Sequence, residues 1–290
     1  MIRIDREKCT LCGFCMEVCQ NYVYMKESGS PQIIAKYPDQ CCDCGHCIAI
    51  CKADAIIHDG VNKSDIEELP PIAITPEAME NLIFSRKSIR IFQDKQVPDD
   101  LINRLIEVAT YAGTSSNGQS EEFIVIRDWD LLRKLEKRCI DILWNAGLKY
   151  LGSGGLMSKI LLKKYGPEML RQYKSYHGVI RHYKEKEEKG GWVFRNAPTV
   201  IVMHGLAANF LGHANCAIAI RNIELFALTL GLGSCWSGLL VVAANKKKKA
   251  IHKILGLPMD REIYGALLLG YPRHNYNCKI KRKRRKVIRL

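Results

Sequence analysis

Two runs of cysteine near the start of the chain restrict its folding more than any other feature of the sequence. Each run has the spacing C-x2-C-x2-C-x3-C, and the second run repeats the first. The first three cysteines of a run lie in one tight loop, whereas the fourth lies too far round that loop to join them. The first run is Cys9, Cys12, Cys15 and Cys19, and the second is Cys41, Cys44, Cys47 and Cys51.

This spacing is typical of bacterial ferredoxins, in which the fourth cysteine of each run binds the cluster of the other run. The sequence therefore predicts two 4Fe–4S clusters in a duplicated unit. Zinc sites usually combine two separated pairs of ligands, and disulfides suit small secreted domains, so both explain the repeat less well. The predicted ligands are Cys9, Cys12, Cys15 and Cys51 for the first cluster, and Cys41, Cys44, Cys47 and Cys19 for the second.

The chain has 13 cysteines in 290 residues, and those outside the ligand sets are expected to be ordinary small residues. The stretch from Met1 to Cys9 is charged and has no apolar run, so we expect no signal peptide and a reducing cytoplasm. The five remaining cysteines are Cys42, Cys139, Cys216, Cys235 and Cys278.

The positions of the cysteine runs, of the prolines and of the apolar segments divide the chain into two predicted domains and a linker. Residues 1–60 form the cluster domain, residues 61–76 a linker with Pro70 and Pro71, and residues 77–290 a larger layered domain. In the larger domain we expect helices over 98–112, 128–139 and 214–230, and strands over 123–126, 200–203, 236–242 and 263–269.

One stretch, residues 225–244, contains no charged side chain and could be mistaken for a membrane span. Gly231, Gly233 and Gly238 interrupt it, and a buried helix, a glycine turn and a buried strand explain it better. We therefore expect no membrane span. Residues 149–191 are basic and rich in tyrosine, and are expected to cover a pocket.

Three segments of the larger domain favour a second cofactor. Residues 85–90 (S-R-K-S-I-R) supply guanidinium, ammonium and hydroxyl groups suited to a dianionic phosphate. Residues 114–119 (T-S-S-N-G-Q) supply amides that can meet the edge of an isoalloxazine ring. Residues 231–238 (G-L-G-S-C-W-S-G) contain glycines that let backbone N–H groups approach a flat ligand. Together they indicate a flavin.

In this order the segments resemble the nitroreductase family of FMN enzymes. The family opening S-R-R-S-I-R-x-F, then D-K-x-V-P, is similar to residues 85–92 and 94–98, and its G-L-G-S-C-W-x-G motif matches residues 231–238. The similarity covers residues 77–290, so the whole chain resembles a ferredoxin–nitroreductase fusion. This implies an α+β fold: a ferredoxin-like domain with two 4Fe–4S clusters, followed by a three-layer α/β/α FMN domain.

The resemblance also implies an obligate homodimer with the FMN sites at its interface. Asn117 and Gln119 would line the flavin across that interface, and the backbone around Ser237 and Gly238 would face its reactive N5. Residues 120–121 are serine and glutamate where the family usually has proline and tryptophan, which leaves the substrate preference open. The residues expected at the FMN phosphate are Arg86, Lys87, Ser88, Arg90 and, from the basic tail, Lys281 or Arg282.

The formal net charge of +14 would be offset by about half once two clusters and a flavin phosphate are bound. We expect Lys246–Lys249 to form a solvated helix face and the basic tail to meet a phosphate or an acidic redox partner. No recognition module for nucleic acid accompanies the tail, so binding to nucleic acid is not expected.

These features predict an enzyme, an FMN- and iron–sulfur-dependent oxidoreductase. Electrons from a one-electron donor, such as an acidic ferredoxin, would pass through the clusters to FMN and on to a small acceptor, for which a nitroaromatic compound is one candidate. The alternatives are an ene-reductase or flavin reductase at the same site, and a non-enzymatic module that delivers electrons to a protein partner. The sequence assigns no catalytic residue and leaves open the substrate, the direction of flow and the choice between ferredoxin and NAD(P)H.

Overall fold

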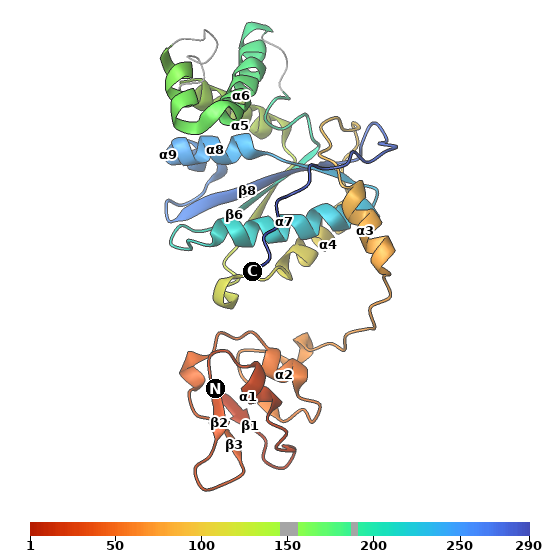
Figure 1. The fold of residues 1–290 in the computed structure, drawn as a ribbon, viewed down its shortest axis with the longest axis vertical. Helices are drawn as coiled ribbons and strands as arrows, with labels where there is room; N and C mark the ends of the chain where they lie inside the picture. The colour runs from red at the N-terminus through yellow and green to blue at the C-terminus, as the bar shows by residue number, and fades with distance from the viewer. Residues whose placement is uncertain (146–155, 187–190) are drawn as a thin grey trace. The chain divides into compact units, whose positions relative to one another are not determined.

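The structure is a computed structural model that describes residues 1–145, 156–186 and 191–290 (Figure 1). The chain divides into two compact units, which are described separately. The first unit comprises Met1–Ala73 and Thr114–Gln119, and the second comprises Ile74–Gly113 and Ser120–Leu290.

The first unit contains two short antiparallel strand pairs and two one-turn helices. Strand β1 (Ile2–Ile4) pairs with β4 (Ile56–His58), and β2 (Tyr24–Lys26) pairs with β3 (Ile33–Ala35). Its helices follow the two cysteine loops. They are α1 (Phe14–Val18) and α2 (His46–Ile50), with the short 3-10 turns η1 (Pro38–Gln40), η2 (Lys63–Asp65) and η3 (Ser115–Asn117).

The duplication of the cysteine runs extends through this unit. When Cys9 is aligned with Cys41, the start of α1 coincides with the start of α2, and the start of β2 with that of β4. The backbone repeats as well, since each cysteine loop contains a glycine with positive φ, Gly13 at 82° and Gly45 at 72°. Non-glycine residues with positive φ are uncommon, and two further pairs coincide in the same alignment. These pairs are Leu11 with Asp43, and Tyr22 with Asp54.

The second unit is built on a four-stranded antiparallel sheet with the order β5-β6-β8-β7. The strands are β5 (Glu122–Ile126), β6 (Thr199–Leu206), β7 (Gly233–Trp236) and β8 (Arg261–Gly270). Its helices are α3 (Pro76–Ser85), α4 (Asp99–Thr110), α5 (Trp129–Asn145), α6 (Leu156–Lys186), α7 (Gly212–Thr229), α8 (Gly238–Lys246) and α9 (Lys248–Leu255).

Both faces of this sheet are covered by helices. Successive residues of a strand point to opposite faces, so Val202 of β6 packs with α5, α8 and α9, while Ile201 packs with α4 and α7. In β8, Leu268 lies on the same face of the sheet as Val202, and Leu267 lies on the same face as Ile201. Figure 1 shows α8 and α9 on one side of β6 and β8, with α4 and α7 on the other. This is the predicted three-layer α/β/α arrangement.

Local signals in the sequence set several helix starts. The Thr75 hydroxyl accepts a hydrogen bond from the Ala78 amide at 3.2 Å and so caps α3. The Asp128 carboxylate likewise accepts from the Leu131 amide at 2.8 Å at the start of α5. A cap satisfies an amide that has no partner within its helix, which is why these polar residues precede apolar runs.

The predicted strand over residues 236–242 is wrong. Strand β7 ends at Trp236, and helix α8 begins at Gly238. A short apolar run fits a buried strand and a buried helix equally well, so its periodicity does not distinguish strand from helix. The lysine run is divided between the end of α8 and the start of α9, and Lys248 forms an ion pair with Glu262 at 2.9 Å.

Among the described residues, no helix has both the length and the apolarity needed to span a membrane. Cys139, Cys216 and Cys235 are buried in the second unit, as expected for small core residues. The predicted pocket cover over 149–191 lies in part outside the described residues, namely at 149–155 and 187–190.

Candidate cofactor sites

A cavity of about 320 Å³ in the first unit is lined by cysteines from both runs. Cys9 and Cys12 come from the loop before α1, Cys15 from the first turn of α1, and Cys51 from the end of α2. The other lining residues are apolar or small, apart from Thr10 and Lys52. Four sulfur donors around one apolar space fit the ligand chemistry of an iron–sulfur cluster.

Burial makes the Cys15 thiol reluctant to ionise. It raises the pKa of Cys15 to about 11; the Met16 amide opposes this shift, and the charges of Cys9 and Cys12 add to it. A cluster requires thiolates, so binding of the metal must supply the free energy that ionises Cys15. The donor set therefore suits a group with strong positive charge at the centre of the cavity.

The second set of cysteines is gathered around Cys47. Burial raises the pKa of the Cys47 thiol, and the nearby charges of Cys44 and Cys19 act in the same direction. The Tyr24 hydroxyl donates a hydrogen bond to Cys47 Sγ at 3.2 Å, which lowers that pKa in part. Burial also raises the pKa of Tyr24 well above its usual value, so its hydroxyl keeps its proton.

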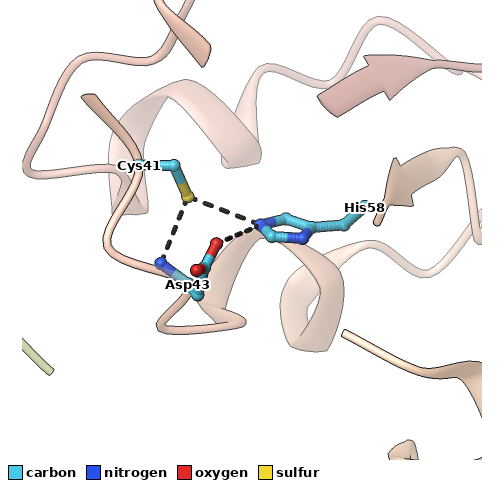
Figure 2. Close-up of side chains that lie close together, drawn as sticks. All are labelled: Cys41, Asp43 and His58. Carbon is cyan, nitrogen blue, oxygen red and sulfur yellow. Dashed lines mark hydrogen bonds and ion pairs between the residues drawn. The ribbon is translucent and has the colours of Figure 1, made fainter. Parts of the chain in front are cut away.

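Cys41 lies beside a histidine that the sequence analysis did not single out. Figure 2 shows the side chains of Cys41, Asp43 and His58 converging. Their ligand atoms all lie within 4.8 Å of one another. His58 Nε2 lies 3.4 Å from Cys41 Sγ and 3.5 Å from Asp43 Oδ1. The His58 side chain is only 2% exposed. It follows that His58 belongs to the immediate surroundings of the second cysteine set.

In the second unit, Arg86 follows the end of α3 and lies against α7. Its Nη1 is 3.3 Å from Glu224 Oε1, and Arg221 Nη1 is 3.1 Å from Glu224 Oε2. Glu224 is thus a buried carboxylate between two guanidinium groups. A guanidinium has five N–H donors, so this pairing leaves Arg86 able to bind a second anion. Lys87 donates to the Phe84 carbonyl at 3.1 Å.

Ser88 lies beside β7, which contains the middle of the glycine-rich motif. Ser88 and Ser234 form a parallel bridge, and the Ile89 amide donates to the Ser234 carbonyl at 2.9 Å. Ser237 is buried, and its hydroxyl donates to the Val193 carbonyl at 3.0 Å. The fold thus brings together the basic segment at 85–90 and the glycine-rich segment at 231–238, which lie far apart in the sequence.

Arg195 is a residue of this region that sequence reasoning missed. Burial lowers the pKa of its guanidinium, and the charge of Arg90 lowers it further. Cys235 is near both arginines, since their charges lower its pKa while burial raises it. Two guanidinium groups that repel each other beside Arg86–Ser88 fit a site for a dianion. Arg195 carries no motif, and its positive φ of 55° is visible only in the structure.

The remaining predicted residues lie at different places. Gly238 is the first residue of α8, after Ser237 at its N-cap. In the first unit, Asn117 Nδ2 donates to the Cys42 carbonyl at 3.0 Å, and Gln119 has a positive φ of 42°. Lys281 and Arg282 are exposed in the irregular tail, whose Lys279 ammonium lies 4.1 Å from the centre of the Phe84 ring, near the end of α3.

Comparison with known proteins identifies both parts. The model of the nitroreductase family matches residues 83–271, and that of the 4Fe-4S dicluster domain matches residues 1–52. The chain belongs to the nitroreductase family. It is an oxidoreductase of the flavin-dependent class with an N-terminal iron–sulfur domain.

Individual relatives agree with this assignment. A protein of Archaeoglobus fulgidus named NADH dehydrogenase/NAD(P)H nitroreductase is 26% identical over 194 residues, covering 66% of this chain and 84% of its own length. A protein of Methanothermobacter thermautotrophicus with the same name is 24% identical over 193 residues, covering 67% and 76%. The crystal structure of a nitroreductase with bound FMN from Bacteroides fragilis has 23% identity and a TM-score of 0.54, covering 74% of this chain and 99% of that one. This last likeness concerns the fold.

Proposed function

We propose that the chain binds two 4Fe–4S clusters and one FMN per protomer, and that it passes electrons from a one-electron donor through the clusters to the flavin and on to a small acceptor. The observation that carries the proposal is the cavity lined by Cys9, Cys12, Cys15 and Cys51, because it combines ligands from both cysteine runs. Cys41, Cys44, Cys47 and Cys19 are proposed for the second cluster, supported by the nearness of Cys44 and Cys19 to Cys47, whose pKa is raised by burial and by their charges.

The proposed FMN phosphate site is made of Arg86, Lys87, Ser88 and Arg90, with Lys281 or Arg282 from the tail. Its support is the bridge between Ser88 and Ser234, which brings residues 85–90 to the glycine-rich segment, and the nearness of Arg90 and Arg195 to Cys235 in that segment. Ser237 holds its hydroxyl on the Val193 carbonyl, so its backbone is fixed at the start of α8. When bound, the flavin supplies the exchange between one-electron and two-electron chemistry.

Asn117 and Gln119 are proposed to line the flavin of the partner protomer in a homodimer. The exposed basic tail, residues 279–289, is proposed to attract an acidic donor of the ferredoxin type. Opposite charges steer such encounters and make them sensitive to salt. Free thiols and clusters both suit a reducing cytoplasm, where we propose the protein acts.

The test compares Cys51→Ala with Cys42→Ala, which removes an equal side chain outside the proposed ligand sets. Parent and Cys42→Ala protein purified without oxygen should contain about eight iron atoms per protomer, and Cys51→Ala protein fewer. All three should retain FMN. In stopped-flow measurements with reduced ferredoxin, flavin reduction should be fast in the parent and Cys42→Ala and lost in Cys51→Ala.

Each part of the proposal can fail separately in this experiment. Stoichiometric zinc without iron would exclude the clusters, and a flavin-free parent would exclude the FMN site. Equal rates of flavin reduction in Cys51→Ala and the parent would show that the clusters do not feed the flavin. Failure to turn over any small acceptor, with rapid electron delivery to a protein, would favour an electron-transfer module instead.

The phosphate site has a matched pair of arginines for its own test. Charge-assisted hydrogen bonds are worth about 1.5–3 kcal/mol, so Arg86→Ala should weaken FMN binding by about tenfold or more. Arg221→Ala removes the other arginine that pairs with Glu224 and should leave FMN affinity close to that of the parent. Equal affinities for both variants would remove Arg86 from the site.

A further inference from the structure

The duplication in the first unit allows its two cysteine sets to be compared position by position. Equivalent cysteines have the same exposure: Cys15 and Cys47 are both 9% exposed, and Cys12 and Cys44 are both exposed. The crossing cysteines also match, since the Val23 amide donates to Cys19 Sγ and the equivalent Ala55 amide donates to Cys51 Sγ, both at 3.4 Å. In these respects the two sites are equal.

The first difference is a hydroxyl group. Tyr24 donates to Cys47 Sγ at 3.2 Å from a buried position. The equivalent residue in the second half of the duplication is Ile56, which lines the cavity that contains Cys15. An isoleucine side chain has no donor, so the first cysteine set has an apolar contact where the second has a hydrogen bond.

The second difference is His58, which lies on Cys41. The Gly60 amide donates to His58 Nδ1 at 3.1 Å, so in the neutral ring the proton is on Nε2. Nε2 is the atom that lies 3.4 Å from Cys41 Sγ. Figure 2 draws this contact as a dashed line. The equivalent residue in the first half of the duplication is Lys26, which is exposed. A backbone donor adds to this difference, because the Asp43 amide donates to Cys41 Sγ at 3.3 Å.

The backbone around His58 is shaped to keep this contact. A Cβ atom at Gly60 would lie 2.8 Å from Asp43 Oδ1 and 3.0 Å from His58 Cε1, so a side chain at this position would displace the carboxylate or the ring. Cys41, Asp43 and His58 could also be considered for a mononuclear metal. The proton on Nε2 argues against that, because a metal ligand must present a lone pair.

We propose that the two clusters have different reduction potentials, and that the cluster at Cys41, Cys44, Cys47 and Cys19 has the higher one because Tyr24 and His58 donate to its thiolates. This rests on the two clusters of the proposed function. Reduction adds one electron, supplied by the one-electron donor, and the added negative charge strengthens hydrogen bonds to the sulfurs. The first electron is therefore expected on this cluster. Tyr24 acts on it through Cys47, and His58 through Cys41.

One nearby charge opposes the effect. The Asp43 carboxylate is negative and disfavours an added electron, but its side chain is 62% exposed, so water and salt screen it. Tyr24 and His58 are buried, and their hydrogen bonds are not screened in this way. The hydrogen bonds from Tyr24 and His58 therefore raise the reduction potential by more than the Asp43 carboxylate lowers it.

The experiment is an anaerobic redox titration of the full-length protein, followed by EPR, on the parent and on Tyr24→Phe, His58→Leu and the double variant. Tyr22→Phe is the control, since it removes an equal hydroxyl from a side chain that is 76% exposed. The parent should show two separate midpoints. Each single variant should lower only the higher midpoint, corresponding to about a tenfold change in the one-electron equilibrium constant, or about 59 mV. The double variant should bring the two midpoints together.

Iron analysis of each protein separates failure of this inference from failure of the two-cluster proposal. With about eight iron atoms per protomer, midpoints that shift no more than in Tyr22→Phe would overturn it, as would a shift of the lower midpoint. A parent with one cluster, or with another metal bound at Cys41 and His58, would overturn the inference because the chain would then not bind two 4Fe–4S clusters. If a variant loses iron, stepwise reduction of the parent followed by NMR tests the order of the two potentials instead. The first electron must shift the β-protons of Cys41 and Cys47 before the second shifts those of Cys9 and Cys15.

Discussion

The two units of this chain differ in what holds them together. The first has one small core of seven buried residues, two of which are the ligand candidates Cys15 and Cys47. The second has two larger cores of buried residues, one on each face of its sheet. Burial of an apolar side chain contributes about 1.5–3 kcal/mol, so the second unit can fold on its hydrophobic core and the first cannot rely on one.

The difference places the two kinds of cofactor in different structural roles. In the first unit the proposed ligands Cys15 and Cys47 belong to the core and Cys19, Cys41 and Cys51 pack against it, so we expect metal binding and folding to be one process. In the second, Arg86, Ser88 and Ser237 lie at the ends of helices and strands that the cores already fix. A cofactor in the second unit can leave without loss of the fold.

Removal of iron gives the largest test of this comparison. Treatment of the full-length protein with a chelator and reductant should unfold the first unit and leave the second intact. Hydrogen exchange measured by mass spectrometry should show protection lost over β1 to β4 and retained over β6 and β8. Protection of both units in the metal-free protein would show that the first unit does not depend on its clusters.

A pair of valines tests the hydrophobic side of the comparison. Val202 in β6 is fully buried, whereas Val125 in the neighbouring strand β5 is 36% exposed. Val202→Ala should cost about 2–3 kcal/mol through lost burial and a residual cavity, and Val125→Ala well under about 1 kcal/mol. All four tryptophans lie in the second unit, so their fluorescence during urea unfolding reports on it alone.

The visible spectrum of the clusters is the control for the valine pair. It should be the same in Val202→Ala, Val125→Ala and the parent, because neither residue lies in the first unit. Equal destabilisation by the two substitutions would contradict the assignment of Val202 to the core. Loss of cluster absorbance in Val202→Ala would show that the units depend on each other for stability.

Sequence reasoning went furthest where chemistry imposes a spacing. The cysteine runs predicted a duplicated unit, and the same repeat recurs in its helices and positive-φ residues. The layered fold of the second unit followed from the family motifs and from buried strands such as β6. The strand over 236–242 was wrong because so short an apolar run has no period that separates strand from helix.

Residues that act through tertiary contacts carry no local motif in the sequence. His58 lies 17 positions from Cys41, and its effect depends on the register of β1 with β4, in which it pairs with Ile2. Tyr24 reaches Cys47 across 23 positions. Alignment of the chain with itself, with Cys9 placed on Cys41, would have exposed the pairs Tyr24–Ile56 and Lys26–His58. Arg195 would not have been found in this way, since it lies outside the repeat.

The smallest expected effect concerns acid sensitivity of the second unit and a histidine buried in β6. Burial lowers the pKa of His204; Arg261 and His252 act in the same direction, and Glu122 opposes them. In the unfolded chain the pKa is about 6.5. Below that pH the unfolded state binds a proton that the folded state disfavours, so the stability of the second unit should fall as the pH drops from about 7.5 to about 5.5.

Urea unfolding followed by tryptophan fluorescence should show this loss in the parent and in His274→Gln, whose histidine is exposed. His204→Gln should lose less stability over the same interval, because it has no imidazole to protonate. An equal loss in both variants would assign the acid sensitivity to other groups.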